Sequence, residues 1–182
     1  MRVRMMAVTA LGLLLSACAS VPGAGQAPVQ LFGAQDAPRF HAYLACTSHT
    51  VDCTIVQRAF DRWADERHVA LDAVAPDNAA FMTGKPSPAT EQSQPYRVTM
   101  RYAPDLSAPA NPMGGGSMRP MISYTATVHV FDAATGRLLK TMSFKDKAII
   151  DQDGGPANPY IDAQVHAFLK QLDPAYARAS AS

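Results

Sequence analysis

The chain has 182 residues, 48% of them hydrophobic, and a formal net charge of +1 at pH 7. This length suffices for one domain with a hydrophobic core, and the near-neutral charge excludes a basic field for nucleic acid. After residue 17 no apolar run approaches the roughly 20 residues of a membrane-spanning helix, so composition predicts a globular domain.

Residues 1–17 have the three-part layout of a secretory signal. Arg2 and Arg4 are followed by the apolar run 5–15 and then by Ser16 and Ala17. A positive start, a short apolar middle and small residues at the exit are typical of a signal peptide. The apolar run is too short to remain in a bilayer as a permanent helix.

The four residues Leu15-Ser16-Ala17-Cys18 resemble the lipobox of bacterial lipoproteins. The resemblance implies cleavage before Cys18, a diacylglycerol thioether on its sulfur and usually a third acyl chain on its new amino group. In the sorting rule that this resemblance implies, Asp at residue 19 retains a lipoprotein in the inner membrane. Residue 19 is Ala here, so the resemblance implies the outer membrane, with the domain facing the periplasm. The alternative is an ordinary secretory signal with Cys18 as a bystander.

The remaining cysteines, Cys46 and Cys53, form an even pair in an oxidising compartment and predict a disulfide. The alternative is a metal site that includes His49. Zinc needs three or four ligands, however, and the sequence offers no second cluster of Cys or His. We therefore expect neither a metal nor another cofactor.

Hydrophobic periodicity predicts an α+β domain over 39–174, after a flexible tether at 18–38 and before a disordered tail at 175–182. The fold class expected is an antiparallel or mixed sheet of four to five strands with two helices packed on one face. A hairpin is expected at the centre of the sheet, and Asp52 and Asn158 are expected to cap the helices. The predicted strands are 39–46, 69–74, 96–103, 121–132 and 137–146, and the predicted helices are 53–68 and 159–172.

Several of these segments together resemble a family of small proteobacterial envelope lipoproteins of unknown function. They are Leu15–Cys18, the pattern around Phe40 and Tyr43, the hairpin Val128–Leu138 and a closing helix that ends near Asp173-Pro174. The resemblance implies an envelope lipoprotein, and the lipidated Cys18 is the only functional residue it supplies.

The alternating strand 96–103 places Arg97 and Arg101 on its polar side, and His129 lies on a neighbouring strand. These three residues are our candidate contact surface for an envelope protein or glycan, and the alternative is an ordinary solvated face. No Gly-x-Ser-x-Gly elbow is present, and His129 near Asp132 is the closest approach to a catalytic pair. We therefore expect a non-enzymatic binding or envelope-support module, the alternative being a periplasmic hydrolase.

We predict that Cys18→Ser releases the protein from the membrane, because the acyl chains on this sulfur provide the anchoring. Fractionation of cells into soluble and membrane fractions measures the effect. Recovery of the variant in the membrane fraction, at the level of the unaltered protein, would contradict the anchor.

Overall fold

The structure, a computed structural model, describes residues 28–78, 81, 94–107, 119–151 and 157–179. The expected signal peptide 1–17, the lipidation site Cys18 and the first part of the expected tether lie outside the described residues. Within the described ranges, no helix is long and apolar enough to cross a membrane.

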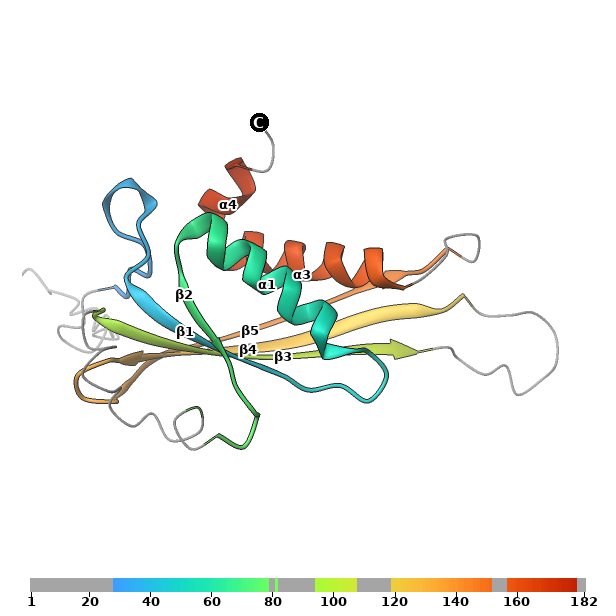
Figure 1. The fold of residues 1–182 in the computed structure, drawn as a ribbon, viewed down its shortest axis with the longest axis horizontal. Coiled ribbons are helices and arrows are strands. Elements are labelled where there is room, and N and C mark those ends of the chain that lie inside the picture. Colours follow the sequence, from blue (N-terminus) through green and yellow to red (C-terminus); the bar gives the residue numbers. More distant parts are fainter. Residues whose placement is uncertain (1–27, 79–80, 82–93, 108–118, 152–156, 180–182) are drawn as a thin grey trace, which may run out of the picture.

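Five strands form one mixed sheet in the order β2-β1-β3-β4-β5 (Figure 1). β1 pairs in parallel with β2 and β3, whereas β3, β4 and β5 are antiparallel to one another. The strands are β1 (Phe40–Cys46), β2 (Ala70–Ala73), β3 (Tyr96–Ser107), β4 (Met121–Asp132) and β5 (Leu138–Ile149).

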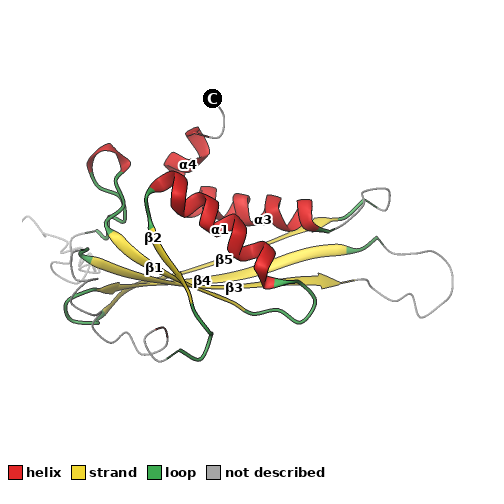
Figure 2. Ribbon diagram, viewed as in Figure 1, coloured by secondary structure: helices red, strands yellow, loops and turns green. Residues whose placement is uncertain are grey.

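Two long helices, α1 (Cys53–Arg67) and α3 (Asn158–Leu172), lie side by side on one face of this sheet (Figure 2). A short helix α4 (Pro174–Ala179) follows α3, and a 3-10 turn η1 (Ala34–Asp36) precedes β1. The predicted fold class, an α+β domain with a mixed sheet and two helices on one face, is confirmed.

The core lies between the sheet and the helices, as the two hydrophobic periods require. Phe60 and Phe168, from the inward faces of the two helices, meet Tyr102 and Tyr124, which stack with ring centroids 5.0 Å apart. All four side chains are at most 2% exposed. Burial of these large rings is the main term that holds the helices to the sheet.

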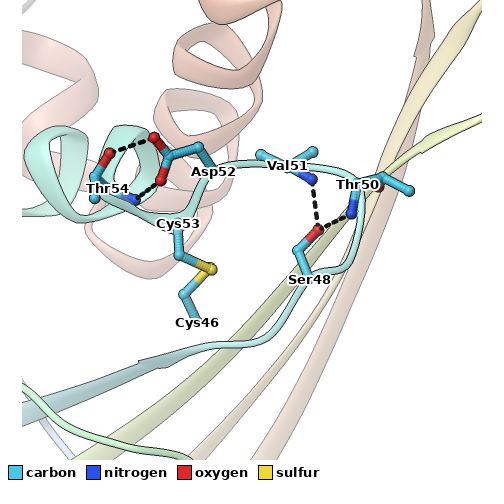
Figure 3. The surroundings of a disulfide bond; sticks show 7 residues. All are labelled: Cys46, Ser48, Thr50, Val51, Asp52, Cys53 and Thr54. Carbon is cyan, nitrogen blue, oxygen red and sulfur yellow. Dashed lines mark hydrogen bonds between the residues drawn. A yellow bond between two sulfur atoms is a disulfide. The ribbon is translucent and has the colours of Figure 1, made fainter.

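The predicted disulfide joins Cys46 at the end of β1 to Cys53 at the start of α1 (Figure 3). Asp52 caps α1 as predicted, because its carboxylate accepts hydrogen bonds from the backbone N–H and hydroxyl of Thr54 at 2.9 and 2.8 Å. These bonds lower the pKa of Asp52. Between the two cysteines the Ser48 hydroxyl accepts the N–H of Val51 at 2.9 Å, which closes the turn.

Two local predictions are wrong. The β4–β5 hairpin does not lie at the centre of the sheet, because β1 inserts beside β3 and leaves β5 at an edge. The residue before α3 is Ala157 rather than Asn158, and it makes no side-chain cap. Asn158 and Pro159 both occupy the first turn, where unpaired N–H groups make Pro acceptable.

The expected tether and tail are also shorter than predicted. Residues 28–38 pack on the domain, with Phe32 edge-on to Phe40 at a centroid distance of 5.5 Å. At the other terminus residues 174–179 are helical, and Tyr176 is only 6% exposed. Both segments are rich in Ala and Pro, a composition typical of linkers. The few larger apolar side chains that attach them to the domain form no periodic pattern.

A buried carboxylate connects these terminal segments to the helices. Asp173 is fully buried and accepts hydrogen bonds from Trp63 Nε1 at 3.1 Å and from Arg67 Nε at 2.6 Å. The N–H groups of Ala175 and Tyr176 also donate to it. Arg67 in turn donates to the backbone oxygen of Asp36 in η1 at 2.9 Å.

We predict that Asp173→Ala lowers the free energy of unfolding by about 3 kcal/mol, because it leaves Arg67 and Trp63 without their shared buried acceptor. Urea denaturation of the soluble domain measures the change. Asp162→Ala is the control, since its ion pair with Arg62 is exposed and such pairs contribute less than about 1 kcal/mol. Equal effects of the two substitutions would contradict the role assigned to Asp173.

We predict that the double variant Cys46→Ala, Cys53→Ala is less stable by about 2.5 kcal/mol, the chain-entropy value for a loop of this length. The disulfide acts by restricting the unfolded chain. Its removal leaves the Asp52 cap of α1 in place. Denaturation of the oxidised protein, the reduced protein and the double variant tests this. An unfolding midpoint that does not change on reduction would contradict it.

Candidate functional site

The two helices cover one face of the sheet, and half of the opposite face is left to solvent. Side chains of β4 and β5 alternate across the sheet, so every second residue points away from the helices. We call this surface the open face. It consists of Ser123, Thr125, Thr127 and His129 on β4 and Thr141, Ser143, Lys145 and Lys147 on β5.

The open face is polar and cationic, and it is hollowed at one place. Thr125 lies opposite Lys145 and Thr127 opposite Ser143, and these two cross-strand pairs border a surface hollow. On β5 all four of its members are exposed. Rows of hydroxyls flanked by ammonium groups can donate hydrogen bonds to a carboxylate or phosphate partner.

The other half of the same face is covered. Tyr43 and Ala45 on β1 are buried in a small cluster with Phe81, against which Val74 packs. Thr99 on β3 is 1% exposed. Val74 and Phe81, which follow β2, therefore cover part of β1 on this face, and the ring of Phe81 also lies against the guanidinium of Arg101 on β3.

The structure places the three residues of the predicted contact surface, Arg97, Arg101 and His129, on this face but with different exposures. The three residues share this face, but Arg97 is only 1% exposed, and its guanidinium lies over the ring of Phe131 at 5.0 Å. Arg101 is half-buried beneath Phe81, with its guanidinium 5.8 Å from the ring centroid. His129 is half-buried and remains at the border of the open face.

The open-face residues that the first prediction omitted were visible in the sequence. The hairpin alternates apolar and polar positions, and the polar positions include Thr and Ser on β4 and Ser and Lys on β5. The sequence does not indicate that Val74 and Phe81 cover part of β1 on the same face.

A second hollow lies on the outer side of the helical layer, between α1 and α3. Its floor includes Ala59 and Leu169, and the ion pair of Arg62 with Asp162 spans it. At one end the ring of His166 contacts Tyr176 edge-on at 5.0 Å. Burial lowers the pKa of His166, and the nearby Lys170 lowers it further, so its imidazole is mainly neutral at pH 7.

This helical hollow places a neutral imidazole among side chains that include no Ser, Thr or Cys. A hydrolase of the Ser–His or Cys–His type needs such a hydroxyl or thiol within hydrogen-bond reach of the base. His129 and Asp132, the pair considered from sequence, lie at positions that alternate to opposite faces of β4. Asp132 instead accepts hydrogen bonds from Thr135.

The metal alternative for the cysteines does not apply, because both sulfurs are used in the disulfide. Among the residues that the structure describes, no three His, Cys, Asp or Glu side chains are grouped as a metal site would need. His41 pairs with the single carboxylate of Asp72 at 2.9 Å and stacks on Tyr43.

No protein-family model matches the sequence, and no curated protein matches it. The fold is similar to a putative neuraminyllactose-binding hemagglutinin homolog from Helicobacter pylori, with 9% identity and a TM-score of 0.45 over 78% of this chain and 89% of that one. The PelC dodecamer from Paraburkholderia phytofirmans has 11% sequence identity and a TM-score of 0.42, over 74% of this chain and 90% of that one. A minor lipoprotein from Acinetobacter baumannii has 10% sequence identity and a TM-score of 0.37, over 73% of this chain and 93% of that one.

Proposed function

We propose that the protein is an outer-membrane lipoprotein, anchored through acyl chains on Cys18, whose periplasmic domain binds an anionic envelope partner without catalysing a reaction. The anchor is supported by the lipobox residues 15–18 and the preceding signal. Two or more acyl chains provide stable anchoring, whereas one chain alone binds only marginally.

The observation that supports a binding role is the open face itself. A sheet face that helices or another layer do not cover must be polar to remain in water. Here its exposed members combine hydroxyls with Lys145 and Lys147, and its acidic neighbour Asp105 lies on β3, opposite Ser123. The net charge of this surface is positive although the mature chain is close to neutral, so a partner with carboxylate or phosphate groups is electrostatically favoured.

Site-specific photocrosslinking in intact cells tests this function. We expect a photoreactive amino acid at Thr125 or Ser143 to capture the partner, and the same group at Lys170, exposed on α3, to capture none. An adduct that protease removes identifies a protein partner, and one that muramidase removes identifies a glycan.

The double variant Lys145→Glu, Lys147→Glu should abolish the adduct from Ser143 and leave the unfolding midpoint unchanged, because both lysines are exposed. The matched control is Lys170→Glu, which should leave the adduct intact. Equal adducts from Thr125 and from Lys170, or an adduct that survives the double charge reversal, would contradict the open face as the binding surface.

A further inference from the structure

The segment that leads from the lipid anchor into the domain is held in a fixed place. We call residues 28–38 the arm. The oxygen of Leu31 accepts the N–H of Arg39 at 2.9 Å, and Arg67 donates to the oxygen of Asp36 while its guanidinium lies 5.4 Å from the ring of Phe32. The point where the chain leaves the arm is therefore defined relative to the sheet.

Backbone hydrogen bonds place the arm at the same end of the sheet as the β4–β5 turn. Tyr96 N–H donates to the oxygen of Arg39 at 3.2 Å, and Ala133 N–H donates to the oxygen of Pro95 at 3.1 Å. The arm, the first residues of β1 and β3, and the turn therefore adjoin one another (Figure 1, left). We call this the turn end.

The length of chain before the arm restricts how the domain can stand on a membrane. Ten residues, 18–27, precede the arm, the first of them bearing the lipidated sulfur, and ten residues span at most about 35 Å. A strand of twelve residues such as β4 is about 40 Å long. An upright domain resting on the opposite end of the sheet would hold the arm beyond the reach of the anchor.

The turn end presents the side chains that a phospholipid surface accepts. Leu138 is 50% exposed and follows the exposed Arg137. The turn that carries them is rigid, because Thr135 donates twice to the Asp132 carboxylate at 2.8 Å and Gly136 adopts the positive φ that the turn needs. The cations Arg39 and Arg137 lie at this end, and guanidinium groups bind phosphate oxygens in pairs.

We propose that the turn end is a membrane-docking surface: Leu138 enters the boundary between headgroups and acyl chains, while Arg137 and Arg39 contact phospholipid phosphates. This inference rests on the Cys18 anchor proposed above. It orients the strands away from the bilayer, so the open face projects into the periplasm, where a partner can approach it.

The test uses the full-length lipidated protein in vesicles of phosphatidylethanolamine and phosphatidylglycerol. Leu138→Cys and Ile149→Cys are each labelled with an environment-sensitive fluorophore; the native Cys46 and Cys53 are unreactive in their disulfide. Ile149 is the matched control, since it is an exposed apolar residue at the opposite end of the same strand. We expect a severalfold rise in emission and quenching by lipid-borne quencher at position 138, and neither at 149.

The acyl mass on Cys18 is measured first, which separates the two proposals. Absence of that mass overturns the anchor and the docking surface together. With the mass present, an aqueous signal at position 138, or equal lipid contact at 138 and 149, overturns the docking surface alone. Arg137→Gln should reduce the signal at 138 in these vesicles, whereas Lys147→Gln should not.

Discussion

The arrangement of this molecule depends on one buried acceptor, the carboxylate of Asp173. It lies where α3 ends and collects donors from the indole of Trp63, the guanidinium of Arg67 and the first amides of α4. A buried carboxylate in this position is stable because these donors satisfy its oxygens. The same contact fixes the two long helices to each other, since Trp63 and Arg67 both belong to α1.

Arg67 extends this network to the arm, through the backbone of Asp36 and the ring of Phe32. The arm is thus tied to the C-terminal end of α1, beside the end of α3. With the anchor proposed at Cys18, this tie makes the orientation of the domain on a membrane depend on the fold as well as on the length of the linker.

The open face follows from simple dimensions. Five strands spaced about 4.8 Å apart make a sheet roughly 19 Å wide, and two helices of about 10 Å diameter cover that width once. The residues that the structure describes include no further helix long enough to cover the opposite face, and there Phe81 and Val74 pack against Tyr43 and Ala45 of β1. The long hairpin strands remain exposed, and their sequence is polar there.

Local periodicity in the sequence predicted nearly every element. The apolar stripe of α1, its Asp52 cap and the alternation in β3, β4 and β5 are short-range patterns, and each gave the observed structure. The cysteine pair could be inferred because only two thiols remained after Cys18.

The errors concern long-range placement. Nothing in the hairpin sequence states whether β1 will insert beside β3 or pack outside β5. Arg97 is buried with its guanidinium over Phe131, its partner across the β3–β4 pair, so its charge alone gave the wrong exposure. The arm was mistaken for linker because its attachment depends on Arg67, which lies 31 residues beyond Asp36.

The position of β5 at the sheet edge connects the open face with the turn end. An edge strand of twelve residues presents unpaired backbone groups and invites pairing with a second chain. Lys140, Lys145 and Lys147 counter this by placing positive charge on both sides of the strand. The lysines on the open face therefore have a structural role, the protection of the edge strand, besides any role in binding a partner. For this reason, the polar neighbours Thr125 and Ser143, which edge protection does not require, are the more informative positions for locating a bound partner.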